Sequence, residues 1–212
     1  MQNRRTFIAA ASAATGASLG FPAIALGQSP RTLSLGHVNP PGTGYDILAS
    51  TFGTRLKELS KGALAIQVYP GGQLGNEEPM TQKLRAGDLD FVISSTANFA
   101  AAIPQAGVFS LEYLYPSEAI VVKSVTDPGI NDTFEKMVRA SLPGAVAVGL
   151  FAQGLRSMFA KFTITSVADV KGKKVRVQAT KTEDAFMVAY DAVPVHMPFG
   201  QVYTALQTGV VQ

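Results

Sequence analysis

Apolar and polar residues alternate along this 212-residue chain in patterns that predict strands and helices in turn. Leu33 and Leu35 are separated by small or polar residues, which predicts a first strand that starts at Thr32 and ends before the turn at 39–42. Apolar residues between positions 45 and 59 recur at intervals of three and four, as on one face of an amphipathic helix. The chain therefore opens with a strand followed by a helix.

The same alternation continues to the end of the chain. The pattern predicts strands at 63–69, 89–94, 145–151 and 174–178, and helices at 76–86, 182–190 and 200–208, with two helical patches inside 116–140. Asn76 is suited to begin the second helix as its N-cap, and Gly87 to end it. Repeated strand–helix alternation predicts an α/β architecture with a largely parallel sheet.

The first 27 residues have the pattern of an export signal. Arg4 and Arg5 form a short basic head, and residues 7–26 are rich in alanine, serine and glycine and end in small-x-small spacings of the kind that signal peptidases cleave. The paired arginines followed by an apolar residue indicate the twin-arginine type. An uncleaved membrane anchor is the alternative, and Pro22 argues against it. We expect a soluble protein in the periplasm.

Composition excludes several function classes. The chain carries 18 basic and 15 acidic residues, and two of the basic residues lie in the export signal, so the remainder is nearly neutral and gives no reason to expect a nucleic acid partner. Cysteine is absent, which excludes disulfides, cysteine-ligated metals and a cysteine nucleophile.

Catalytic and metal-binding signals are also scarce. His37 and His196 lie far apart in the sequence and lack the spacing of metal ligands. The adjacent carboxylates Glu183 and Asp184 point in different directions on a helix, so we expect a solvated helix face there. The sequence therefore predicts no enzyme activity, no metal and no cofactor.

Two arginines, Arg176 and Arg156, have apolar neighbours in the sequence. Arg176 lies between Val175 and Val177 in a predicted strand, so its side chain projects from the face opposite the two valines. Arg156 precedes the same strand. A guanidinium in such a place pairs with a carboxylate, either an internal one, with Asp184 available for Arg176, or one from a ligand.

Four stretches resemble the solute-binding subunits of tripartite ATP-independent periplasmic (TRAP) transporters of the DctP type. They are VYPGGQLG at 68–75, LRAGDLDF at 84–91, VKGKKVRV at 170–177 and MPFGQVYTALQTGVV at 197–211. The resemblance implies a periplasmic-binding-protein-like fold with two α/β lobes around a cleft. After the export signal at 1–27, it implies lobe I at 28–150 and a partial lobe II at 151–212, because relatives continue beyond this point. The chain is thus expected to be a truncated form.

The resemblance also implies a ligand site. Arg176 matches the family's arginine that clamps the ligand carboxylate, Arg156 matches an assisting arginine, and Phe199 matches the aromatic residue that packs against the ligand. Ser95 and Asn98 match a variable wall position, and Asn39 lies in a loop that faces the cleft.

The function implied is capture of a small organic acid and its delivery to membrane permease subunits, with no catalysis. Two alternatives remain open at this point. One is an exported hydrolase that acts on acidic substrates, and the other is a ligand-sensing protein with the same fold.

Overall fold

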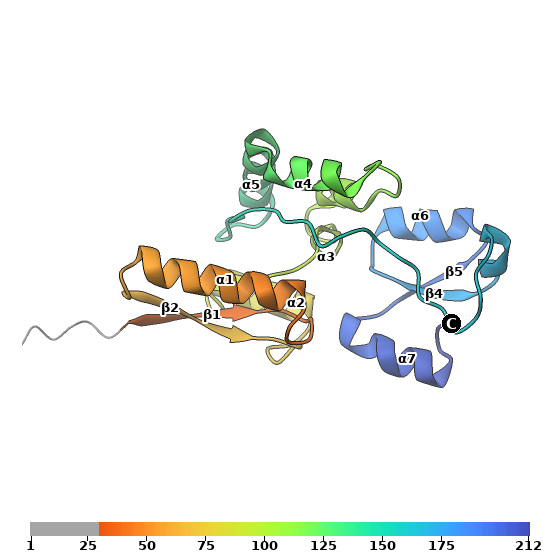
Figure 1. Cartoon of the computed structure of the whole chain (residues 1–212), viewed down its shortest axis with the longest axis horizontal. Helices are drawn as coiled ribbons and strands as arrows, with labels where there is room; N and C mark the ends of the chain where they lie inside the picture. Colours follow the sequence, from red (N-terminus) through yellow and green to blue (C-terminus); the bar gives the residue numbers. More distant parts are fainter. Residues whose placement is uncertain (1–29) are drawn as a thin grey trace, which may run out of the picture.

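The computed structural model describes residues 30–212, and the predicted export signal lies outside the described residues (Figure 1). Fifteen elements follow one another in this part of the chain. The first six are β1 (Arg31–Gly36), α1 (Gly44–Leu59), β2 (Leu64–Tyr69), α2 (Glu77–Ala86), β3 (Phe91–Val92) and α3 (Thr96–Phe99). The next four are η1 (Pro104–Ser110), α4 (Glu118–Thr126), α5 (Pro128–Ser141) and η2 (Val167–Val170). The last five are β4 (Lys174–Val177), α6 (Lys181–Ala189), β5 (Val193–His196), η3 (Phe199–Gln201) and α7 (Val202–Thr208).

The first sheet has three parallel strands in the order β2-β1-β3. Helix α1 packs against β2, and a small apolar cluster of Val38, Met80 and Leu89 lies beside the central strand. Gly36 is the last residue of that strand, and its backbone passes so close to α2 that an added Cβ would meet the Met80 sulfur at 2.7 Å. The arrangement places the carboxyl ends of the strands, and the loops that follow them, at one edge of the sheet.

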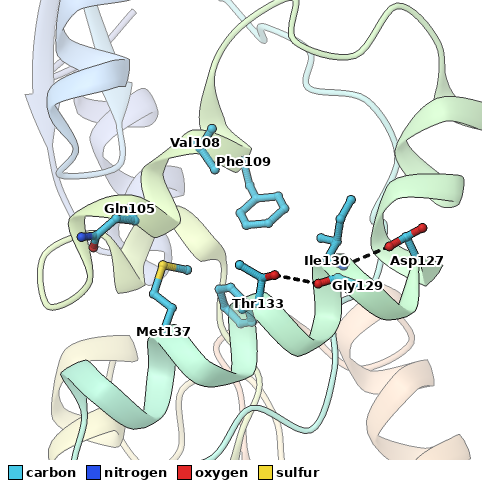
Figure 2. Close-up of a pocket in the computed structure, with 9 residues that line it drawn as sticks. Gln105, Val108, Phe109, Asp127, Gly129, Ile130, Thr133 and Met137 are labelled. Carbon is cyan, nitrogen blue, oxygen red and sulfur yellow. Dashed lines mark hydrogen bonds between the residues drawn. The ribbon is translucent and has the colours of Figure 1, made fainter.

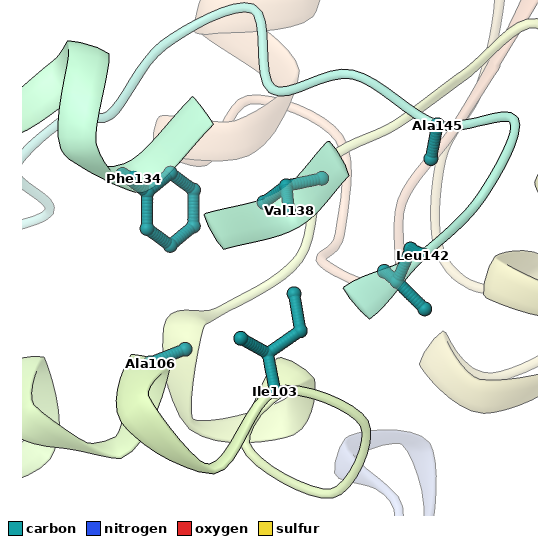
Figure 3. Close-up of a cluster of buried hydrophobic side chains, with 6 residues drawn as sticks. All are labelled: Ile103, Ala106, Phe134, Val138, Leu142 and Ala145. Atoms are coloured by element: carbon teal, nitrogen blue, oxygen red, sulfur yellow. The ribbon is translucent and has the colours of Figure 1, made fainter. Parts of the chain in front are cut away.

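A helical region follows the third strand. Six buried side chains form its core (Figure 3). Ile103 immediately precedes η1 and Ala106 lies within it, Phe134 and Val138 belong to α5, and Leu142 and Ala145 follow α5. Phe109 adds an edge-to-face contact with Phe134, at 5.8 Å between ring centroids. Burial of these side chains holds η1 and α5 together.

The second sheet has two parallel strands, β4 and β5, with Arg176 paired to Val195. Val175 and Val177 lie on the side that packs against Met187 of α6, so Arg176 belongs to the opposite face, as strand alternation predicts. Helix α7 lies on the other side of these strands from α6 in Figure 1. The face that carries Arg176 is therefore not the face packed by α6.

Most predicted elements form where the sequence places them. Both patches of 116–140 are helices, α4 and α5, and all strand pairs of the two sheets are parallel. The strand expected at 89–94 is reduced to Phe91–Val92. Asn76 stands at the N-cap of α2, but its side chain makes no capping hydrogen bond.

The strand predicted at 145–151 is wrong. This segment has no regular structure, and Val146 and Val148 are 51% and 70% exposed. Its backbone is held near its two ends, where Ala145 N donates to Leu142 O and Leu150 N donates to Asn131 Oδ1, both at 3.0 Å. Alternation of side chains does not make a strand unless a neighbouring strand supplies the ladder of hydrogen bonds, and none within residues 30–212 does so.

The two sheets are built from residues 31–92 and residues 174–196. The lobe boundary at position 150 remains a prediction. None of the helices described is both long and apolar enough to cross a membrane.

Candidate functional site

Arg176 is fixed by the polypeptide backbone and not by a carboxylate. Its Nε and Nη2 donate to the carbonyl oxygen of Met197, at 3.1 and 3.0 Å. No aspartate or glutamate among residues 30–212 lies within 4.0 Å of its nitrogens. A guanidinium has five N–H groups in a planar fork, so the edge formed by Nη1 and Nη2 keeps N–H groups that make no hydrogen bond within the described chain.

Partial burial affects the charge of Arg176. Removal from water lowers the pKa of its guanidinium, while the carboxylates of Glu183 and Glu77 act in the opposite direction. The internal partner suggested by the sequence is engaged elsewhere, because Asp184 lies 2.6 Å from His196 Nε2 on the surface. Arg176 is thus an ordered cation that no carboxylate of residues 30–212 contacts directly.

Arg156 has a different environment. Its Nη1 lies 2.9 Å from Glu183 Oε1, its Nη2 donates to Gln178 Oε1 at 3.1 Å, and its Nε lies 3.9 Å from Glu112 Oε1. Its side chain is about half exposed, whereas that of Glu183 is 1% exposed. Arg156 is therefore in an internal ion pair, which was the alternative interpretation of this residue.

Glu183 is a buried anchor that the sequence analysis missed. The expectation of a solvated carboxylate at this position is wrong, because Glu183 lies beneath the first turn of α6. Its Oε2 accepts a hydrogen bond from Gln178 N at 2.7 Å, and its own backbone N–H donates to Thr180 Oγ1. Oε1 makes the charge contact with Arg156 but no hydrogen bond. The Thr180-x-x-Glu183 spacing is a capping-box pattern and was the signal available in the sequence.

Gln178 links the two sheets. Its Nε2 donates to Ser95 Oγ, and Ser95 is the N-cap of α3, where the same hydroxyl accepts from Asn98 N at 3.2 Å. Ser95 and Asn98 are thereby brought next to the end of β4 and to Arg156. Gln178 was not predicted as a site residue.

The other two predicted site residues are Phe199 and Asn39, and neither is hydrogen-bonded to Arg176 or Arg156 within residues 30–212. Phe199 is 41% exposed in η3, two positions after the Met197 carbonyl that holds Arg176. Asn39 lies in the loop after β1, where its carbonyl accepts from Gly71 N at 2.9 Å. No hydrogen bond joins Asn39 to the other predicted residues within the described part of the chain.

Glu112 and Glu77 extend the charged cluster. Burial raises the pKa of Glu112, the nearby Arg156 lowers it and Glu183 raises it. Glu77 is the first residue of α2 and is partly buried. Glu112 thus lies 3.9 Å from Arg156, and the charge of Glu77 raises the pKa of Arg176.

Two cavities lie away from this cluster. The first, of about 410 Å³, is lined by apolar side chains of η1 and α5, including Phe109, Phe134 and Met137 (Figure 2). The second lies at the end of α1, around Lys57. Neither is lined by a predicted site residue. Residues 30–212 also contain no group of three or more side chains suited to hold a metal ion.

Comparison with known proteins identifies the family. The sequence model of the bacterial extracellular solute-binding proteins, family 7 (DctP), matches residues 35–212. The chain belongs to this family. Family 7 consists of solute-binding proteins, so the resemblance to TRAP transporter subunits is confirmed.

Relatives of family 7 confirm the α/β fold. The C4-dicarboxylate-binding periplasmic protein DctP of Rhodobacter capsulatus is 31% identical over 211 residues, which cover 98% of this chain and 61% of that protein. The sugar acid binding protein DctPAm of Advenella mimigardefordensis, in complex with galactonate, superposes with a TM-score of 0.80 at 25% identity, over 87% of this chain and 59% of that one. A TRAP periplasmic solute-binding protein of Citrobacter koseri with bound D-glucuronate gives a TM-score of 0.78 at 28% identity, over 86% and 60%.

The chain spans only part of the length of its family 7 relatives. It covers between 38% and 61% of the first curated proteins that it matches.

Proposed function

We propose that this protein captures a small organic acid by docking its carboxylate on Arg176. The observation that carries the proposal is the state of that guanidinium, which is held on one edge by the Met197 carbonyl and has no protein carboxylate within 4.0 Å among residues 30–212. A carboxylate fits the remaining Nη1–Nη2 edge through two parallel hydrogen bonds. A partly buried cation with an open fork is the chemistry expected of an anion receptor.

The remaining predicted residues take supporting roles in this proposal. Arg156 assists at the ligand while bound to Glu183, and Phe199 supplies an apolar surface for the ligand. Ser95, Asn98 and Asn39 supply polar groups at the carboxyl ends of the first sheet. The ligands of similar structures support the acid class, since galactonate, D-glucuronate and succinate are all carboxylic acids.

Capture would be completed by closure of two lobes, 28–150 and 151–212, around the acid. Closure removes the ion pair from water and so strengthens it. The closed, loaded protein would then deliver the acid to the membrane permease subunits of a TRAP transporter. The names of the relatives support a periplasmic location for this step.

Solute binding is favoured over hydrolysis by the position of the two histidines. His37 is fully buried, and His196 contacts Asp184 at the surface. Neither ring is hydrogen-bonded to a serine or threonine within residues 30–212. A nucleophile activated by a histidine base requires such a contact.

Replacement of Arg176 by lysine tests the proposal. An ammonium group cannot hold the Met197 carbonyl and a bidentate carboxylate at once, so Arg176→Lys should weaken binding of galactonate at least about tenfold, as expected when charge-assisted hydrogen bonds are lost. Isothermal titration calorimetry measures the effect. Arg55→Lys is the matched control, because Arg55 pairs with Glu58 on the surface of α1. Equal affinity in Arg176→Lys and the wild type would refute the clamp.

A further inference from the structure

The side chain of Gln178 lies between two predicted site residues that come from different regions of the chain. Its Oε1 accepts a hydrogen bond from Arg156 Nη2 at 3.1 Å, and its Nε2 donates to the hydroxyl oxygen of Ser95. Ser95 precedes Gln178 by 83 residues and belongs to the region of the first sheet. One amide group therefore joins the assisting arginine to the variable wall position.

The chemistry of these two partners suits an amide at position 178. A guanidinium carries N–H donors and no acceptor, so the amide oxygen must face Arg156 and the NH2 group must face Ser95. A carboxylate at this position would offer no donor to Ser95, and an ammonium group would offer no acceptor to Arg156. An amide serves both partners at once.

The buried anchor of Arg156 also fixes the backbone of Gln178. Glu183 Oε2 accepts from Gln178 N at 2.7 Å, while Oε1 of the same carboxylate lies 2.9 Å from Arg156 Nη1. The carbonyl oxygen of Gln178 accepts from Thr180 N, also at 2.7 Å. Within residues 30–212 the Nε2 end of the amide makes one hydrogen bond, the one to Ser95. The side chain at position 95 therefore holds the end of the amide that Glu183 and Arg156 do not hold.

We infer that Gln178 is a positioning residue that couples the side chain at position 95 to the orientation of Arg156, an inference that rests on the proposed function. The Ser95 hydroxyl is itself fixed, because it also accepts from Asn98 N at 3.2 Å as the N-cap of α3. A guanidinium that is already oriented loses less conformational freedom when a ligand binds, which raises affinity. A change at position 95 thus acts on the ligand through Gln178 and Arg156, in addition to any contact of its own.

The side-chain NMR signal of Arg156 tests the coupling without a ligand. Ser95→Ala removes the oxygen that holds the amide, so the Nε–H resonance of Arg156, assigned by its loss in Arg156→Lys, should shift by more than its line width. Ser95→Thr keeps the hydroxyl and should leave the resonance near its wild-type position. In Gln178→Met, which has no amide, Ser95→Ala should cause no further shift. This last comparison also controls for the loss of the α3 N-cap.

Ligand affinity tests whether the coupling serves the proposed function. The probe is whichever of galactonate, D-glucuronate and succinate binds the wild type in isothermal titration calorimetry. Gln178→Met should weaken its binding about three- to tenfold in the wild type but less than about twofold in Arg156→Lys, because Gln178 acts through Arg156. Gln178→Met and Ser95→Ala together should weaken binding at least about threefold less than the product of their separate effects.

Gln67→Met is the matched control for removal of an amide. The Gln67 side chain is exposed on β2, where its Nε2 donates to the carbonyl oxygen of Val68 at 3.4 Å. This variant should leave both the Arg156 resonance and the affinity unchanged.

The outcomes separate this inference from the proposed function. An Arg156 resonance that does not respond to Ser95→Ala overturns the coupling but leaves organic acid capture in place. Equal losses of affinity from Gln178→Met with and without Arg156, or losses that simply multiply in the double variant, overturn the positioning role. Absence of binding of all three acids by the wild type overturns the proposed function and, with it, the role of Gln178 at the ligand.

Discussion

At the scale of single residues, Arg176 and Arg156 show how surroundings decide what a guanidinium can do. The Met197 carbonyl orients Arg176 without cancelling its charge, because a carbonyl oxygen is a neutral acceptor. Glu183 orients Arg156 and cancels its charge at the same time. Two arginines in one cluster therefore offer a ligand different amounts of attraction.

His37 is a second residue whose surroundings determine its chemistry. It is fully buried beyond the end of β1, its ring packs edge-on against Tyr45, and neither ring nitrogen makes a hydrogen bond. Burial lowers the pKa of the imidazole below 6.5, and Asp46 opposes this only in part, with 3.5 Å between Nε2 and Oδ1. We expect stability to fall as the pH drops below about 6.5, because the unfolded state then binds a proton that folded His37 resists.

Urea unfolding at pH 7 and pH 5 measures this effect. His37→Leu, of similar volume, should flatten the dependence between these pH values and leave stability at pH 7 nearly unchanged, since an unbonded buried polar group is removed. The comparison with the wild type isolates His37 from Glu112, whose raised pKa acts with the opposite sign. Equal pH dependence in the two proteins would contradict the assignment.

At the scale of elements, two helix starts that look alike in the sequence differ in the structure. Asp127 begins α5, and its Oδ1 accepts from Ile130 N at 3.0 Å just before Pro128 at the first helical position. Asn76 begins α2 and makes no such bond. Asp127→Ala should lower the free energy of unfolding by about 1 kcal/mol, the usual contribution of a bonded N-cap. Asn76→Ala should lower it clearly less in the same urea titration, and equal losses would show that the caps do not differ.

The elements that could be predicted are those whose signal is local. Helix α1 follows its apolar spacing, and α4 and α5 are separated where the Asp127-Pro128 pair interrupts the pattern. The strand at 145–151 could not be predicted correctly, because strand formation depends on a neighbour elsewhere in the chain. Local alternation carries no information about that neighbour.

The candidate site, too, could be predicted only where a residue has a local sequence signal. An arginine between two valines in a strand is conspicuous, and the structure places it on the face that α6 does not cover. Glu183 was missed because adjacent positions on a helix face different directions, and Glu183 is buried whereas the side chain of its neighbour Asp184 is 36% exposed. The Met197 carbonyl carries no side-chain signal at all. The Met197 carbonyl that holds Arg176 and the buried Glu183 that neutralises Arg156 are therefore evident only in the folded structure.

At the scale of the whole molecule, few polar contacts join the region of the first sheet and the helices that follow it, up to α5, to the region of the second sheet, from β4 onward. Gln178 reaches Ser95, and the hydroxyl groups of Tyr113 and Tyr190 lie 3.0 Å apart. Tyr113 is 85% exposed, and its hydrogen bond raises the pKa of Tyr190 to about 12. Contacts of this kind stabilise one arrangement of the two regions only weakly.

The tyrosine pair provides a test of closure that avoids the proposed ligand residues. Tyr113→Phe removes one hydroxyl but keeps the ring near Phe186, at 6.0 Å between centroids. If closure precedes tight binding, the variant should populate open forms more often, and the apparent affinity for galactonate should fall by about two- to fivefold, as expected for loss of one exposed hydrogen bond. The radius of gyration from X-ray scattering should rise without ligand and return to the wild-type value at saturation.

The matched control for this test is Tyr203→Phe. The Tyr203 hydroxyl accepts from Gln207 within α7, so its loss removes a hydrogen bond that joins no two regions. A fall in affinity in both variants would indicate a general loss of stability. Unchanged affinity and an unchanged radius of gyration in Tyr113→Phe would show that this contact does not hold the regions together. Only an affinity loss confined to Tyr113→Phe, reversed in shape by excess ligand, matches a closure equilibrium in which the acid and the tyrosine pair favour the same state.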